Sequence, residues 1–413
     1  MSHIYLTRYA YPERCLDVDW HAENPEIIVV LPAHNEPDLI RSLAALEDCA
    51  CSAAVSVIVM VNASAKASDQ VKELNHKSYN EACQWSVNRK HNYHFIINNE
   101  LPAKHAGVGL ARKIGMDEAA RAFDMIDKDG VILCFDADSV CEPNLLEEVL
   151  HLFSDPKVNG CSIHYEHPMS GDLDQMQYEG IINYELHLRY YIDALRFAGF
   201  PYAFQTIGSS MAARSSVYMK QGGMNRRKAG EDFYFLHKII PLGGFYNLNT
   251  TTIYPSARVS DRVPFGTGKA IGDWMEDRLE HYMTYAPQTF LDLKQFLEQV
   301  SSCYEMTESE WGSFYDSLPN SIRSFVYKVE FMDKMKEIKV HATNHALFER
   351  RFYQWFDGFK MLKYVHHARD QFYPNTLISD AVEWLFDVLD LDSSQNALRD
   401  KLGVIRAFDR KQP

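Results

Sequence analysis

The sequence has no apolar run long enough to cross a membrane. A membrane-spanning helix needs roughly 20 consecutive apolar residues, and none of the 413 residues falls in such a stretch. The opening segment, MSHIYLTRYAYPERCLDVDW, carries polar and charged side chains where a signal peptide needs a continuous apolar segment. These absences predict a cytoplasmic protein without a transmembrane segment.

Cysteine pairs and basic runs are also lacking. The eight cysteines form no Cys-x-x-Cys pair and do not share zinc spacing with histidine, so reduced, mostly buried thiols are expected. The formal net charge is −14, and no long basic stripe offsets it, which argues against nucleic acid as a partner. A diphosphate ligand would therefore need local cations or a metal.

What is present is typical of a globular protein of two domains. Apolar residues make up 46% of the chain and charged residues 24%. Four runs rich in β-branched residues predict buried strands, and helical patterns start at Pro37 and cover 110–126. The predicted strands are 27–31, 55–61, 93–97 and 131–135. This alternation predicts a parallel, doubly wound sheet, which binds ligands beyond the carboxyl ends of its strands.

Beyond Pro287 glycine nearly disappears and amphipathic patterns dominate. The four most regular patterns each predict one helix, over 290–300, 322–338, 347–365 and 380–391. We therefore expect an N-terminal extension (1–25), a catalytic α/β domain (26–286) and an all-helical C-terminal domain (287–413).

Two short polar loops follow predicted strands. Pro32-Ala33-His34-Asn35-Glu36 ends the first strand, and Asn62 stands at the end of the second. Each loop can direct side chains at a ligand, although the first loop, taken alone, is better explained as a polar loop that caps the next helix. Neither loop alone defines a site.

Asp136 and Asp138 follow the fourth predicted strand. In an extended segment, residues two apart point the same way, so the two carboxylates are expected to lie together. Paired carboxylates are costly unless a cation neutralises them, and Mg²⁺ or Mn²⁺ fits one or two carboxylates plus phosphate oxygens. The alternative is a turn that caps the helix opened by Glu142-Pro143.

Two glycine-rich stretches carry charged residues. The first runs from Gly208 to Asp232, with cations at 226–228 and the carboxylates Glu231 and Asp232 at the start of a predicted helix, where a general base can be positioned. The second, 258–269, contains Arg258 and Arg262, which could contact a diphosphate, although a surface loop explains it too. The histidines, including His164, His167 and His237, are interpreted as structural, with His237 a minor candidate metal ligand.

Three motifs in this order resemble a known family. Pro-Ala-His-Asn-Glu after the first strand, Phe-Asp-Ala-Asp-Ser after the fourth and Gly-Glu-Asp-Phe opening a later helix are similar to signatures of family 2 glycosyltransferases. The resemblance covers roughly residues 26–270 and implies a GT-A-type, Rossmann-like doubly wound mixed sheet.

The resemblance also implies an activity: inverting transfer of one sugar from a nucleotide-diphosphate donor to a carbohydrate or lipid-linked acceptor. Asp136 and Asp138 would hold Mn²⁺ or Mg²⁺, and Asp232, with Glu231 beside it, would be the catalytic base. The predicted donor-binding residues are Pro32, Ala33, Glu36, Asn62, Arg112, Asp136, Arg258 and Arg262.

The sequence departs from the family pattern in two places. Asn62 stands where an aspartate often reads the base, so the choice of base stays open. The Gln-x-x-Arg-Trp motif of processive members is absent, which implies a single-transfer enzyme.

Three alternatives remain: a retaining enzyme of the same fold, a sugar-phosphate nucleotidyltransferase, and a catalytically silent nucleotide-binding protein. The nucleotidyltransferase would carry a glycine-rich loop after the first strand, and 32–36 contains no glycine. Peripheral membrane contact through the aromatic segment 190–204 also stays open.

Overall fold

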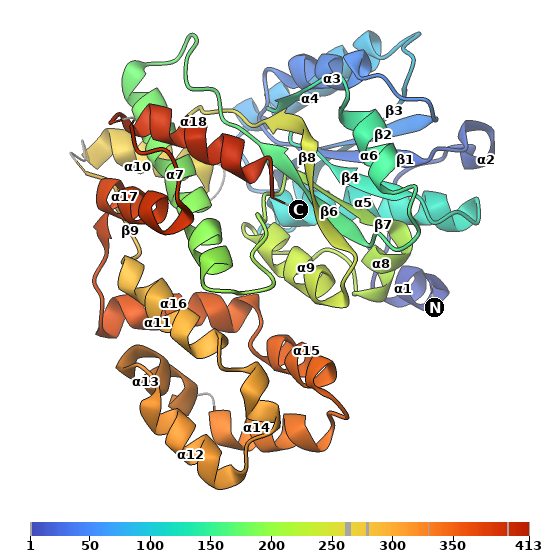
Figure 1. Cartoon of the computed structure of the whole chain (residues 1–413). Coiled ribbons are helices and arrows are strands. Elements are labelled where there is room, and N and C mark those ends of the chain that lie inside the picture. Colours follow the sequence, from blue (N-terminus) through green and yellow to red (C-terminus); the bar gives the residue numbers. More distant parts are fainter. Residues whose placement is uncertain (1, 261–265, 278–280, 329, 395, 413) are drawn as a thin grey trace. The chain divides into compact units, whose positions relative to one another are not determined.

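The computed structural model describes residues 2–260, 266–277, 281–328, 330–394 and 396–412 (Figure 1). The chain divides into two compact units, each made of separate segments. The sheet unit comprises Met1–Ile181, Thr206–Asp277 and Arg406–Pro413, and the helical unit comprises Ile182–Gln205 and Arg278–Ile405. Within the described ranges, no helix combines the length and the apolar character needed to cross a membrane.

The sheet unit is built on eight strands in the order β3-β2-β1-β4-β7-β6-β8-β5, counted over the described residues. Strands β3, β2, β1 and β4 run parallel, β7 pairs antiparallel with both β4 and β6, β6 and β8 are parallel, and β5 is antiparallel to β8. The strands are β1 (Ile27–Ala33), β2 (Val55–Ser64), β3 (Asn92–Leu101), β4 (Val131–Cys134), β5 (Val140–Cys141), β6 (Gly160–Tyr165), β7 (Met211–Arg214) and β8 (Phe245–Tyr254). This mixed α/β sheet confirms the predicted fold class.

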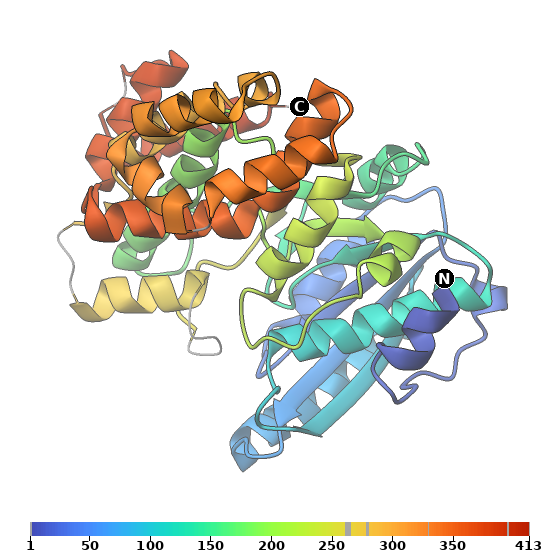
Figure 2. The same ribbon diagram turned by 90° about the horizontal axis from the view of Figure 1, so that it is seen from below.

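Helices cover both faces of the sheet, and Figure 2 shows α5 lying across one of them. The helices of this unit are α1 (Ser2–Arg8), α2 (Trp20–Glu23), α3 (Leu39–Asp48), α4 (Asp69–Trp85), α5 (Val108–Met125), α6 (Leu145–Leu152), α8 (Ser215–Lys220), α9 (Glu231–Ile239), the 3-10 turn η1 (Ile240–Leu242) and α10 (Thr267–Asp277). Helix α7 (Gln175–Phe197) begins in the sheet unit and continues into the helical unit.

Strand β1 shows why a continuous apolar run forms a central strand. All seven of its residues are buried. Ile27, Val29 and Leu31 belong to the core shared with the apolar side of α3. On the other face, a Cβ at Gly115 of α5 would lie 2.5 Å from Val30 Cγ1, so this glycine lets the helix approach the sheet closely. Both faces are packed, as the sequence pattern predicts.

The last residues of the chain belong to the sheet unit. Arg406 donates to the carbonyl oxygen of His167 at 2.7 Å and lies 3.4 Å from the Glu166 carboxylate. Arg410 donates to the same carboxylate at 3.2 Å and to Thr252 Oγ1 at 2.5 Å. The C-terminal end of α18 (Leu398–Asp409) is thereby fastened beside β6 and β8.

The helical unit has an aromatic core. Phe296 of α11 lies 5.6–5.9 Å, between ring centroids, from Phe331, Phe352 and Phe356. The helices are α11 (Pro287–Leu297), η2 (Ser301–Tyr304), α12 (Glu308–Ser317), α13 (Asn320–Lys328), α14 (Phe331–Val340), α15 (His345–Trp355), α16 (Gly358–Gln371), α17 (Ile378–Leu389) and α18, with a small pairing of β9 (Met283–Thr284) and β10 (Thr376–Leu377). The predicted helical character of this region is confirmed.

Two of the predicted helices are each two helices in the structure. The pattern over 322–338 is divided between α13 and α14, where Glu330 has φ 58°, and the pattern over 347–365 is divided between α15 and α16. Asp357 caps α16 by accepting a hydrogen bond from the Lys360 amide at 3.0 Å. Apolar periodicity continued across both breaks, so periodicity alone did not reveal them.

The aromatic segment 190–204 packs inside the helical unit. Tyr190 and Phe200 are buried, and the Tyr190 ring meets Phe290 and Trp384 edge to face. These contacts favour the core-helix interpretation of this segment over contact with lipid.

His187 is expected to make the helical unit sensitive to acid. Its Nδ1 lies 2.8 Å from Thr284 Oγ1, and burial lowers its pKa to about 4. An unfolded histidine titrates near 6.5, so between pH 6.5 and 4 the unfolded chain binds more protons and stability falls as pH falls. His187→Gln should remove on the order of 1–2 kcal/mol of the stability difference between pH 7.5 and 5, measured by urea unfolding.

Replacement of an exposed histidine of the same unit, His341→Gln, is the matched control. If the His187→Gln chain and the unaltered chain lose the same unfolding free energy between pH 7.5 and 5, burial of His187 is not the cause of the acid sensitivity.

Candidate functional site

The candidate site lies at the carboxyl ends of β1, β2 and β4, all within the sheet unit. Ala33 pairs with Val61, and Val30 pairs with Cys134, so the residues that follow these strands lie at one edge of the sheet. The order β3-β2-β1-β4 is that of a nucleotide-binding half-sheet, in which ligands bind at this edge.

The loop after β1 places a buried carboxylate here. Glu36 is 1% exposed, and its Oε1 accepts a hydrogen bond from the Asp38 amide at 3.0 Å. Arg258, 222 residues away in the sequence, donates to Glu36 through both of its terminal nitrogens, at 3.0 Å from Nη1 to Oε1. This two-point ion pair fixes the guanidinium against the loop.

Asn62 ties the ends of β1 and β2 together. Its side-chain nitrogen donates to the Ala33 carbonyl oxygen at 2.9 Å, and its backbone carbonyl oxygen lies 2.7 Å from His34 Nδ1. Asn75 of α4 donates to that same carbonyl at 2.9 Å. Asn62 is therefore part of the framework that holds Pro32 and Ala33 in place.

Asp136 and Asp138 lie in a turn, not in the extended segment expected from the sequence. Strand β4 ends at Cys134, and the Ser139 amide donates to the Asp136 carbonyl oxygen at 3.1 Å, which closes the turn. The two carboxylates bind different arginines: Asp136 accepts from Arg112 at 2.5 Å, and Asp138 from Arg258 at 3.3 Å. Their side chains are 36% and 28% exposed.

Arg112 of α5 is the buried hub of the site. Its side chain is 2% exposed, and it pairs with Asp136 through Nη2 and with Glu231 through Nη1. Asp232 also lies close, since a Cβ built at Gly208 would be 2.7 Å from Arg112 Nη1 and 3.0 Å from Asp232 Oδ2. One guanidinium thus holds together the turn after β4 and the start of α9.

The two carboxylates at the start of α9 differ in their surroundings. Glu231 is buried against Arg112, whereas Asp232 is only partly buried and accepts a hydrogen bond from the Phe233 amide at 2.7 Å. Burial raises the pKa of both groups, against the opposing effect of Arg112. Asp232 is therefore the better placed of the two to accept a proton from a ligand.

The glycine-rich loop before α9 packs against the start of α5. A Cβ at Gly109 would lie 2.1 Å from the carbonyl oxygen of Arg227, so only glycine fits there. The Arg227 guanidinium lies 3.5 Å from the centre of the Tyr234 ring. Arg262, predicted to bind the donor, lies outside the described residues.

The histidines named in the sequence analysis do not form a metal centre. His164 lies 3.0 Å from Glu166, and His237 stacks edge to face on Phe233 with ring centroids 4.3 Å apart. Over the described ranges, no group of three or more His, Cys, Asp or Glu side chains could by itself hold a metal ion.

The donor set does fit a cation that shares its ligands with phosphate. Mg²⁺ is commonly held by one or two carboxylates, with phosphate oxygens and water completing its shell. Asp136 binds Arg112 through one oxygen, and within the described chain its other oxygen accepts no hydrogen bond. Asp136 and Asp138 are the residues that would hold such an ion.

The sequence did not indicate the pairing of these residues. Arg112 and Arg258 were both expected at the donor site, but nothing in their spacing pointed to Glu231 or Glu36 as partners. These pairs join residues 119 and 222 positions apart, and only the folded chain brings them together.

Comparison with known proteins gives a weak structural likeness and no relative in sequence. No family model matches the chain, and no curated protein is similar to it at the level tested. Residues 1–349 of S. aureus TarS in complex with UDP-GlcNAc share 11% identity and a TM-score of 0.37, over 80% of this chain and 91% of that one. The same TarS fragment in complex with UDP shares 10% identity and a TM-score of 0.36, over 80% and 90%. Likeness at this level carries no functional assignment, which rests on the side chains described above.

Proposed function

We propose that this chain is a glycosyltransferase that moves a sugar from a nucleotide-diphosphate donor to an acceptor hydroxyl. The observation that carries the proposal is the Arg112 hub, which pairs with Asp136 after β4 and with Glu231, the residue next to Asp232, at the start of α9. A carboxylate suited to the donor and a carboxylate suited to the acceptor are thereby held at one edge of a nucleotide-binding half-sheet.

Asp232 is proposed as the general base. It would take the proton of the acceptor hydroxyl as that oxygen bonds to the anomeric carbon, while the bond from this carbon to the diphosphate breaks and the nucleoside diphosphate leaves. Attack from the face opposite the leaving group inverts the anomeric centre. In a retaining enzyme Asp232 would only orient the acceptor, and NMR of the new linkage distinguishes the two outcomes.

The charge of the site supports a divalent cation. Among the described residues, two guanidinium groups face six carboxyl groups: Glu36, Asp38, Asp136, Asp138, Glu231 and Asp232. A diphosphate adds further negative charge. Two like charges 4 Å apart repel each other by about 4 kcal/mol at an effective dielectric of about 20. Mn²⁺ or Mg²⁺ on Asp136 and Asp138 would neutralise the leaving diphosphate.

The arginines would assist in the same region. Arg258 is anchored by Glu36 and has a side chain that is 22% exposed, so it can contact a phosphate without losing its anchor. The Arg112 side chain is buried, so we do not assign it a direct contact with the diphosphate. Its proposed role is to orient Asp136 and keep Asp232 in place.

A thermal-shift panel tests donor binding and the metal. UDP, GDP, CDP and dTDP should be tried with and without Mn²⁺, and the matching nucleotide at about 100 times its Kd should stabilise the chain by about 2.7 kcal/mol. We expect the stabilisation to be larger with Mn²⁺, and Asp138→Asn to remove the Mn²⁺-dependent part.

The control is Asp124→Asn, which replaces an exposed aspartate near the end of α5. An Mn²⁺-dependent shift of the same size in Asp138→Asn and Asp124→Asn would refute the metal role of Asp138. A chain that bound nucleotide but turned over no donor would instead be a silent binding protein.

A further inference from the structure

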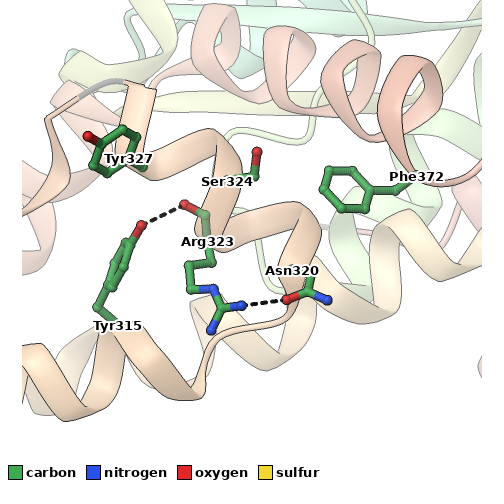
Figure 3. Close-up of a pocket in the computed structure, with 6 residues that line it drawn as sticks. All are labelled: Tyr315, Asn320, Arg323, Ser324, Tyr327 and Phe372. Carbon is green, nitrogen blue, oxygen red and sulfur yellow. Dashed lines mark hydrogen bonds between the residues drawn. The ribbon is translucent and has the colours of Figure 1, made fainter.

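A pocket of about 470 Å³ opens on the helical unit (Figure 3), and none of its lining residues belongs to the candidate site described above. It is formed by α12, by α13 and by Phe372, the residue that follows α16. Its volume lies within the range of about 300–1,000 Å³ that is usual for small-molecule sites. The lining residues are Tyr315, Asn320, Arg323, Ser324, Tyr327 and Phe372.

Three of the lining residues are aromatic. Tyr327 is 75% exposed, which is unusual for a large ring. The other exposed aromatic side chains of the described residues have smaller exposed fractions. The other two rings are held in place: Tyr315 donates its hydroxyl to the Arg323 carbonyl oxygen at 3.2 Å, and Phe372 meets His367 edge to face at 5.7 Å. The pocket therefore presents fixed apolar ring surface to solvent.

The polar groups between these rings are also fixed. Arg323 donates to Asn320 Oδ1 at 2.7 Å (Figure 3). It also donates to the Asp316 carbonyl oxygen at 3.1 Å. These bonds set the plane of the guanidinium and leave the Asn320 amide nitrogen without a partner among the described residues. Ser324 Oγ lies 3.2 Å from His367 Nε2. The pocket therefore combines oriented donors and acceptors with ring faces.

This combination selects one class of ligand. A sugar ring has apolar C–H faces that stack on aromatic rings and a rim of hydroxyl groups that bond to amide, guanidinium and hydroxyl partners. Among the described residues that line the pocket there is no carboxylate to hold a metal ion. The Arg323 guanidinium already donates two N–H groups to the chain, so it is poorly suited to a phosphate. A purely apolar ligand would leave the polar groups unpaired.

We propose that this pocket binds a neutral saccharide and, resting on the proposed function, that it holds part of a saccharide acceptor. The donor site needs no contribution from it, since every residue assigned to the donor belongs to the sheet unit. The pocket thus supplies acceptor recognition from a separate part of the chain.

The test is calorimetric titration of the full chain with neutral tetrasaccharides of glucose, galactose, mannose and N-acetylglucosamine, with a sulfated tetrasaccharide for comparison. We expect at least one neutral tetrasaccharide to bind. Tyr327→Ala should raise the Kd of that tetrasaccharide by about tenfold or more, because the exposed stacking ring is lost. Asn320→Ala should weaken it by a smaller factor. Tyr246→Ala, which removes a tyrosine that is 42% exposed on β8, is the control and should change nothing.

Two results would overturn the proposal: no binding by any neutral tetrasaccharide, or equal binding by the Tyr327→Ala and Tyr246→Ala chains. Tighter binding of the sulfated probe would replace a neutral ligand with an anionic one and would also overturn it. The nucleotide thermal shift should be the same in all these variants. If the unaltered chain showed no thermal shift with any nucleotide, the donor site would be refuted and the pocket would not. If it bound no saccharide, the pocket would be refuted and the donor site would not.

Discussion

Asp232→Asn should lower turnover of the donor by about 10³-fold while leaving nucleotide binding unchanged. General base catalysis contributes roughly 10²–10⁴-fold, and an amide cannot accept the proton of the acceptor hydroxyl. Asparagine keeps the size of the side chain and can still accept the hydrogen bond from the Phe233 amide. The loss should therefore appear in kcat, measured with the nucleotide and metal identified by the thermal-shift panel.

The comparison with Asp124→Asn separates this effect from a general loss of negative charge. Both variants remove one aspartate from the sheet unit, but only Asp232 lies beside Gly208 and Arg112. Turnover by Asp232→Asn within about tenfold of Asp124→Asn would exclude Asp232 as the base. Glu231, buried against Arg112, would then be the next candidate.

Arg112→Met should destabilise the sheet unit by about 3–5 kcal/mol and abolish activity. The substitution leaves Glu231 buried without its cation and removes the partner of Asp136. Removing one member of a buried ion pair costs more than the pair itself contributes, because the remaining charge stays desolvated. Urea unfolding, followed through the transition of the sheet unit, measures the change.

Two further variants show whether the unpaired charge is the cause. Arg112→Met combined with Glu231→Gln should recover about 1–2 kcal/mol, because no buried carboxylate is then left alone. Lys77→Met breaks an ion pair on α4 whose side chains are 68% and 51% exposed, and it should cost less than about 1 kcal/mol. A loss for Arg112→Met as small as that for Lys77→Met would show that the hub does not stabilise the fold.

The parallel half of the sheet was predictable because its signals are local. The run 27–31 is apolar on both faces, and the strand it forms is buried on both. How β6, β7 and β8 join the sheet was not predicted, since β7 pairs with β4 across about 80 residues and its four residues carry no distinct pattern. Strand pairs of this kind depend on contacts between distant segments, which sequence periodicity does not record.

Within the site, residue types were easier to predict than their arrangement. Carboxylates after strand ends and at a helix start were visible as motifs, and a turn at Asp136 and Asp138 was the alternative to an extended segment, yet the pairing of Asp138 with Arg258 was not visible. The two side chains of an Asp-x-Asp segment point the same way only if the segment is extended, and a turn within the segment removes that condition. Here the Ser139 amide closes one, and the two side chains bind different arginines.

The course of the chain through the two units limits how either could be isolated by truncation. The backbone passes from one unit to the other four times, at 181/182, 205/206, 277/278 and 405/406. No single cut, and no simple joining of two genes end to end, would supply either unit whole. A fragment meant to contain only one unit would therefore have to join segments that are separate in the sequence.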